Sequence, residues 1–212
     1  MGHEAVLNPH IDAIPVGEAE RELFHRLRAN AHKMNNRQCV ALAKLAVEDE
    51  ATVVDWRRGD SILSRRMPVG TPIATFMDRE GRDSDYYDGA VGIGAPGNMT
   101  SHAAVLIGYV SGALGVPDGI LVLDQHALLP GMRRMVYPID DTLFGTASAN
   151  NYYAINGLDD RPLGGLANPY WKLQQLNTIP VVKESASLTT TSLLEIDLTA
   201  GNQSKLELVG NP

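Results

Sequence analysis

The chain contains a single cysteine, Cys39, in the stretch NNRQCVALAKLA at residues 35–46, where a polar run changes into an apolar helical pattern. A thiol becomes a useful nucleophile only as the thiolate, and its pKa falls at a helix N-terminus beside an imidazole. A lone cysteine on an apolar helix face is also often a small buried hydrophobic residue. Cys39 is therefore either a core side chain or a nucleophile, and the choice depends on a histidine that folding brings close.

Two of the six histidines, His102 and His126, lie outside the N-terminal segment and are candidates for that base. The others are expected to be solvated side chains, and they are His3, His10, His25 and His32. His102 opens the most apolar run in the chain, HAAVLIGYV, directly after a loop rich in Gly, Asn, Thr and Ser.

The alternation of side chains along two neighbouring runs gives His102 an acidic partner. With a period of two, His102 shares a face with Ala104, Leu106 and Gly108, and Asp124 shares one with Ile120 and Val122. If the two runs pair as antiparallel strands, His102 and Asp124 fall close together, and the carboxylate can orient the imidazole and stabilise the imidazolium. Singly, a histidine at a strand end is often structural and Asp124 can equally satisfy a loop amide. The ordered set favours a nucleophile, its base and an orienting acid.

Two helices are expected at the N-terminal end of the chain. The spacing of apolar residues predicts an amphipathic helix over residues 18–34, with a charged outer face. A second helix is predicted from residues 36–38 to about Glu50, with Asn35 or Asn36 as its N-cap. That helix would hold Cys39 in its first turn, on its apolar side.

A run of strands follows these helices, which predicts an α+β fold with helices packed on an antiparallel sheet. Residues 53–70 read as turns, and residues 78–100 as a long loop of a kind that is often functional. Strands are predicted at residues 71–76, 102–110, 119–126, 133–139 and 148–155.

The chain is predicted to have three parts. Residues 1–34 form a helical extension, residues 35–182 the main domain, and residues 183–212 a Ser/Thr-rich linker with a β-hairpin. The hairpin joins LLEIDL to KLELV, and it would place Leu194, Ile196 and Leu198 on one face.

Composition excludes several classes of function. A net charge of -7, from 18 basic and 25 acidic side chains, gives no basic field for nucleic acid. No apolar run approaches the roughly 18 residues of a membrane span, and the first residues lack the pattern of an export signal. We expect a protein that is made in the cytoplasm without a signal peptide. We expect no metal, because no cluster of Cys, His and Asp residues has zinc spacing, and we expect no cofactor.

An ordered set of short segments resembles a bacterial branch of the papain-like NlpC and CHAP cysteine hydrolases, the superfamily of peptidoglycan amidases and endopeptidases. The resemblance covers roughly residues 35–156, and its segments are RQCVALAKLA, DWRRGD, GTPIATF, SHAAVLIGYV, GILVLDQH and NNYYAI. It implies a papain-like fold, with Cys39 as nucleophile, His102 as general base and Asp124 as the orienting residue. The chain departs from the pattern at His126, where an aromatic residue is usual, and in GNMTSH before the histidine.

Five further residues are candidates for the oxyanion site or the cleft. The implied mechanism needs a second oxyanion donor beside the Cys39 backbone N–H, and Gln38 is a candidate, although its side chain can equally cap the helix or face solvent. Gln125 is another. Trp56, Tyr86 and Tyr87 either pack the core and a loop or wall a cleft that binds a glycan or stem peptide.

The predicted function is hydrolysis of an amide bond in peptidoglycan, in the stem peptide or crossbridge, by an antibacterial effector. The resemblance implies delivery to the periplasm of a target cell by a dedicated system such as type VI secretion, with a secretion-apparatus component and an immunity protein as partners; phage lysins belong to the same superfamily. Two alternatives stay open. One is a deamidase, transglutaminase-like or acyl-transfer enzyme acting on a protein or lipid, and the other is an inactive papain-like binding module.

Overall fold

A computed structural model of the protein describes ten stretches of the chain, and contacts divide the chain into two units, Met1–Thr178 and Ile179–Pro212. The described residues are 16–30, 38–50, 52–78, 80–88, 101–111, 118–125, 132–143, 145–171, 193–196 and 206–209. The predictions for His126, Leu198 and the loop residues 89–100 fall outside these stretches. No helix in these stretches is long and apolar enough to cross a membrane.

The two predicted helices are present in the first unit, and both are shorter than expected. Helix α1 (Glu18–Ala29) ends at Ala29, with Asn30 as its C-cap, rather than at residue 34. Helix α2 (Cys39–Val47) begins at the cysteine itself, because Gln38 has the extended backbone of an N-cap residue. The N-cap prediction for Asn35 or Asn36 was therefore wrong, and the Gln38 side chain forms no cap hydrogen bond of its own.

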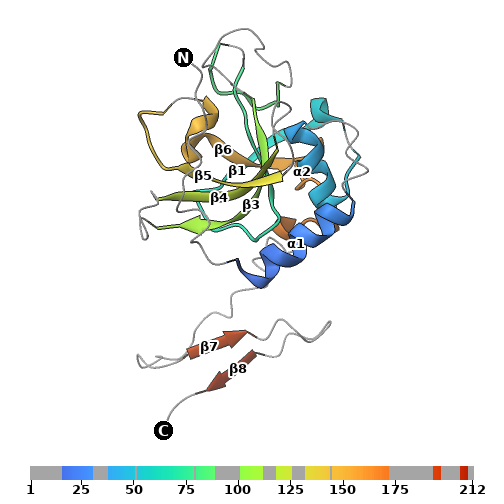
Figure 1. The fold of residues 1–212 in the computed structure, drawn as a ribbon, viewed down its shortest axis with the longest axis vertical. Coiled ribbons are helices and arrows are strands. Elements are labelled where there is room, and N and C mark those ends of the chain that lie inside the picture. Colours follow the sequence, from blue (N-terminus) through green and yellow to red (C-terminus); the bar gives the residue numbers. More distant parts are fainter. Residues whose placement is uncertain are drawn as a thin grey trace. The chain divides into compact units, whose positions relative to one another are not determined.

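The α+β class is confirmed by a six-stranded antiparallel sheet with the order β1-β6-β2-β3-β4-β5 (Figure 1). Its strands are β1 (Arg57–Ser61), β2 (Pro72–Thr75), β3 (Ala103–Val110), β4 (Gly119–Gln125), β5 (Met132–Pro138) and β6 (Tyr152–Asn156). Short 3-10 helices lie at Val53–Asp55, Gly145–Ala147, Ala149–Asn151 and Gly165–Ala167.

Two of these strands correct the sequence analysis. Strand β1, RRGDS, was read as turn because it has no apolar alternation, but it pairs with β6 through Arg57 opposite Asn156 and Arg58 opposite Ile155. Strand β6 begins at Tyr152 rather than at residue 148, because Ser148 caps a 3-10 turn directly before it. In both cases the neighbouring chain, and not local propensity, decides where the strand lies.

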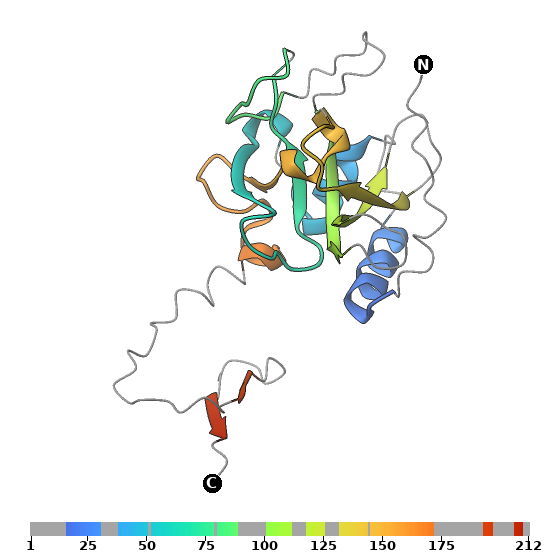
Figure 2. The same cartoon turned by 90° about the vertical axis from the view of Figure 1, so that its left-hand side faces the viewer.

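One face of the sheet is covered by the two helices, which contact each other and β3 and β4 (Figures 1 and 2). Leu42 of α2 is fully buried there, among Leu27 of α1, Val105 of β3 and Leu123 of β4. This apolar contact fixes α2 against the middle of the sheet, so it also fixes the position of the first residue of that helix, Cys39.

The other face of the sheet curls around a second core. Tyr137 of β5 and Tyr152 of β6 stack with ring centroids 5.1 Å apart, although three strands lie between β5 and β6 in the sheet. In a flat sheet, with strands about 4.8 Å apart, the same two strands would be about 19 Å apart. The sheet is therefore strongly bent, and its concave face is filled by side chains such as Ile62, Leu106 and Val122.

A β-bulge in β3 changes which side chains share a face. Leu106 lies opposite Val122, but the next pair is Gly108 with Leu121, so one extra residue enters β3. The prediction that Gly108 shares a face with His102 was therefore wrong, because the register shifts between Leu106 and Gly108. The bulge lies beyond Leu106, so the alternation holds between His102 and Leu106.

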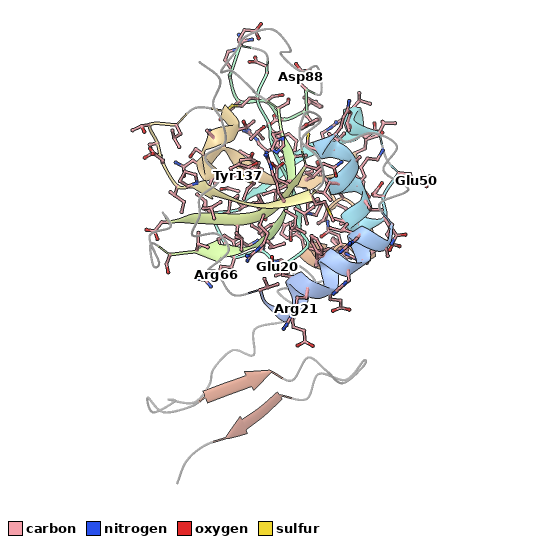
Figure 3. All side chains as sticks on the ribbon, viewed as in Figure 1. Glu20, Arg21, Glu50, Arg66, Asp88 and Tyr137 are labelled. Atoms are coloured by element: carbon pink, nitrogen blue, oxygen red, sulfur yellow. The ribbon has the colours of Figure 1, made fainter. Side chains whose placement is uncertain are left out.

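A buried ion pair joins α1 to the edge strand β5. Arg134 Nε lies 2.7 Å from Glu20 Oε1, and the two side chains are 16% and 6% exposed. Figure 3 labels Glu20, which belongs to α1. The pair holds the start of α1 against the sheet.

The second unit contains the predicted hairpin. Strands β7 (Leu193–Ile196) and β8 (Leu206–Val209) pair antiparallel, with Leu193 opposite Val209 and Ile196 opposite Leu206.

The buried position of Leu42 leads to a stability prediction. Leu42→Ala removes apolar atoms from the interface between α2 and the sheet, so we expect a loss of about 2–5 kcal/mol in the free energy of unfolding, measured by urea titration. The matched control is Leu158→Ala, because Leu158 is 62% exposed and its truncation should cost about 0.5 kcal/mol or less. Equal losses in the two variants would contradict the assignment of Leu42 to the core.

Candidate active site

A buried histidine–aspartate pair lies at one end of β3 and β4. The Nε2 atom of His102 is 2.7 Å from Oδ1 of Asp124, and the residues are 2% and 0% exposed. The strand register explains the contact. Val105 lies opposite Leu123 and Leu106 opposite Val122, so Asp124 is a diagonal cross-strand neighbour of His102 on the same face of the sheet. The proximity inferred from the sequence pattern is present.

The backbone of His102 is held by the neighbouring strand β2. The His102 amide donates to Thr75 Oγ1 at 2.9 Å, and the Thr75 amide donates to the His102 carbonyl at 3.0 Å. Directly before it, the Ser101 hydroxyl donates to the Asp88 carbonyl. Sequence analysis missed Thr75 and Ser101, which look like ordinary strand and loop residues. Together they fix the backbone position from which the His102 side chain extends.

Cys39 reaches this pair from the opposite side, as the first residue of α2. Its half-buried side chain packs against a cluster that contains Phe76, Tyr87 and Ala103. Because Nε2 of His102 is held by Asp124, Nδ1 is the nitrogen left for the thiol. Nδ1 is buried and has no hydrogen-bond partner among the described residues, but the thiol and the imidazole lie close enough to shift each other's pKa.

The two shifts have opposite signs. Burial alone would raise the pKa of the Cys39 thiol, but interactions with His102 and the Ala103 backbone N–H outweigh burial and lower it below its ordinary value of 9.0. Burial alone would lower the pKa of His102, but Asp124 and the thiol outweigh burial and raise it to about 10. The site therefore favours a thiolate beside an imidazolium. The two groups titrate as a coupled pair.

The aromatic candidates for the cleft have three different environments. Trp56 is fully buried, so it is a core side chain and has no surface to offer a ligand. The Tyr87 ring is tilted by 58° to the Trp56 ring, with centroids 5.1 Å apart, and it meets Phe76 edge-on. Its hydroxyl lies within hydrogen-bonding reach of the Cys39 thiol. Tyr86 is 59% exposed, with the guanidinium of Arg57 4.4 Å from its ring centroid. Of the three, Tyr87 lies at the thiol, and Tyr86 is the one exposed at the surface.

The two glutamine candidates also differ. Gln38 is exposed and directly precedes the thiol residue as the N-cap of α2. Gln125 ends β4 and is only 4% exposed, and its Oε1 has no hydrogen-bond partner among the described residues.

The sequence analysis did not single out Arg133, which contacts Asp124 directly. Arg133 Nε and Nη2 donate to Asp124 Oδ2 at 3.0 and 2.7 Å. The two residues are cross-strand partners, Asp124 on β4 and Arg133 on β5. The sequence does not reveal the register in which β4 and β5 pair. Because Arg133 and Arg134 are adjacent, only that register tells which of them faces Asp124.

Residues 25–155, more than half of the chain, match the sequence model of a family described as domesticated amidase effector 2 (Dae2). Among solved structures, the chain is similar to one described as type 6 secretion amidase effector 2 (Tae2), at 22% sequence identity and a TM-score of 0.42. That similarity covers 61% of this chain and 92% of the solved chain. No curated protein matches. The family match includes Cys39, His102, Asp124 and Arg133.

The opposite pKa shifts predict how fast Cys39 is alkylated at each pH. Because the chain has one cysteine, iodoacetamide reports on this thiol alone, and the wild-type rate should rise with a midpoint below pH 9.0. His102→Ala removes the partner that lowers the pKa while burial remains, so we expect its midpoint to move upward. His25→Ala, at an exposed position on α1, is the matched control and should keep the wild-type midpoint. The same midpoint in wild type and His102→Ala would show that the imidazole does not activate the thiol.

Proposed function

The chain belongs to the domesticated amidase effector 2 family, and on that premise we propose that it is a cysteine hydrolase that cleaves an amide bond in peptidoglycan, in the stem peptide or crossbridge. The observation that carries this proposal is the arrangement of Cys39 at a helix start beside the buried His102–Asp124 pair. A nucleophile, a base and an orienting carboxylate are what acyl transfer by a thiol requires. The resemblance of the ordered sequence segments supports a papain-like fold for the main domain.

In the proposed reaction the thiolate of Cys39 attacks the carbonyl carbon of the amide and forms a C–S bond. The tetrahedral oxyanion collapses, the C–N bond breaks, and the imidazolium of His102 gives its proton to the leaving amine. The neutral imidazole then takes a proton from water, whose oxygen attacks the thioester. Cys39 leaves as the thiolate, and the acid product and the thiolate–imidazolium pair are regenerated. Asp124 keeps the imidazole in one orientation throughout.

The start of α2 provides donors for the oxyanion. The first N–H groups of a helix have no carbonyl partner within the helix, and this holds for the amides of Cys39 and Val40. The positive end of the helix dipole points the same way. Gln38 and Gln125 are the side-chain candidates for a second donor, each through its amide NH2 group. Gln38 directly precedes the nucleophile, and Gln125 directly follows Asp124 at the end of β4.

The family name and the earlier resemblance support a setting for this activity. We propose an antibacterial effector that type VI secretion delivers to the periplasm of a target cell, with an immunity protein that protects the producing cell by blocking the site. The exposed Tyr86 beside the buried Tyr87 supports a role for this surface in holding a stem peptide or glycan.

Digestion of purified cell-wall sacculi tests the proposed activity. Wild type should release muropeptide fragments, and Cys39→Ala should reduce the rate by a factor of about 10³ or more because the nucleophile is gone. Mass spectrometry of the fragments identifies the bond that is cut, and thermal unfolding of the variant verifies that it is folded.

Two results would overturn the proposal. Equal digestion by wild type and Cys39→Ala would remove Cys39 from the reaction. No digestion by wild type, together with rapid alkylation of Cys39, would favour a deamidase or acyl-transfer enzyme with another substrate, and slow alkylation would favour an inactive binding module.

A further inference from the structure

The geometry around Asp124 points to a fourth member of the site: we propose that Arg133 is a positioning residue that holds Asp124 ionised and aimed at His102, so that the thiolate of Cys39 is maintained. This inference rests on the proposed roles of Cys39, His102 and Asp124. It goes beyond them because it makes the ionisation of the site depend on a residue of another strand, β5. The contacts described above join Arg133 to Asp124, and none of them joins it to the thiol or the imidazole.

Each oxygen of the Asp124 carboxylate has its own partner. Oδ1 faces His102 Nε2 at 2.7 Å, and Oδ2 accepts from Arg133 Nε at 3.0 Å and from Arg133 Nη2 at 2.7 Å. Two donors from one planar guanidinium converge on Oδ2 and fix the position of that oxygen, while His102 holds Oδ1, so the carboxylate is fixed between the two partners. The oxygen that faces the imidazole is thereby held in place.

Burial makes this second partner necessary. The Asp124 side chain is 1% exposed, and burying a carboxylate without compensation is costly. Burial raises the pKa of Asp124, while the hydrogen bonds and charges of His102 and Arg133 outweigh burial and lower it. With His102 alone, the shared proton could move to the carboxylate. Arg133 opposes that transfer, so the proton stays on the imidazole.

The charges of the site balance only when Arg133 is counted. Thiolate, imidazolium, carboxylate and guanidinium alternate in sign and sum to zero, whereas the first three alone leave a buried net charge of minus one. The charge of Asp124 raises the pKa of Cys39. By Coulomb's law we expect the positive charge of Arg133, which is paired with Asp124, to oppose that effect.

Other ionisable groups around the site do not replace Arg133. Three tyrosines face the charged groups, and each has a pKa raised well above its ordinary value, so they stay neutral: Tyr87, Tyr137 and Tyr152. The negative charge of Asp88 contributes to the raised pKa of Tyr87. Among the described residues, Arg133 is the group besides His102 whose positive charge is paired directly with Asp124.

The neighbouring residue provides a matched control. Arg134 follows Arg133 on β5, so its side chain points to the other face of the sheet, where it pairs with Glu20 of α1. Both arginines form close, largely buried ion pairs, but only Arg133 reaches the candidate site. Loss of either ion pair can lower stability, and only loss of the Arg133 pair should change the chemistry of the thiol.

The experiment measures the rate of Cys39 alkylation by iodoacetamide against pH in folded, full-length wild type, Arg133→Met and Arg134→Met. We expect the midpoint in Arg133→Met to rise by about one pH unit, and the midpoint in Arg134→Met to stay at the wild-type value. In an Asp124→Asn background, Arg133→Met should cause little further shift, because the two residues act through one contact. Arg133→Gln, which keeps a donor without the charge, takes the place of Arg133→Met if that variant does not fold.

A wild-type midpoint in Arg133→Met or Arg133→Gln would overturn the inference, as would an equal shift in Arg134→Met. An undiminished shift in the Asp124→Asn background would also overturn it, since Arg133 would then act by another route. The readout needs no peptidoglycan, so a failed digestion by wild type rejects the proposed substrate and leaves the role of Arg133 to be decided separately.

Discussion

The buried contact between His102 and Asp124 is the constraint on which the rest of the site depends. An imidazole and a carboxylate at 2% and 0% exposure are stable only when each polar atom has a partner and each charge an opposite charge. Three elements surround the pair: β2 fixes the histidine backbone through Thr75, β5 supplies Arg133, and α2 brings Cys39 to the Nδ1 side of the ring. Reactivity of the thiol and stability of the buried pair are thus two results of one arrangement.

Much of this arrangement follows from side-chain alternation, which needs only local sequence. His102 and Asp124 lie on strands whose apolar residues repeat every second position, and both strands run undisturbed between the site and the pair formed by Leu106 and Val122. Cys39 was recognisable because it stands where a polar run becomes a helical pattern. The α+β order could be read for the same reason, since its central strands are strongly apolar and bounded by turn residues.

The features that sequence did not reveal are set by contacts between distant segments. Strand β1 has a polar sequence and exists because β6 pairs with it. The bulge beyond Leu106 turns Gly108 to the other face, and nothing in HAAVLIGYV marks it. Arg133 and Arg134 are equivalent in sequence and have different roles, because one faces Asp124 and the other faces Glu20. Each of these outcomes is a matter of register, which propensity does not encode.

The opposite pKa shifts of Cys39 and His102 also bear on how folding depends on pH. The raised pKa of His102 stabilises the folded chain fully below its unfolded value of 6.5, and this stabilisation is lost as pH rises through about 10. The lowered pKa of Cys39 stabilises the folded chain at pH values above the unfolded pKa of 9.0. This stabilisation is lost as the pH falls through the pKa that Cys39 has in the folded chain. Consider the pH range that lies below 9.0 and above both 6.5 and the folded pKa of Cys39. In this range the folded chain carries one proton on the imidazole, and the unfolded chain carries one proton on the thiol. Folding then moves a proton from sulfur to nitrogen without taking up or releasing any, so a reactive ion pair is built into the protein without making its stability depend on pH in that range.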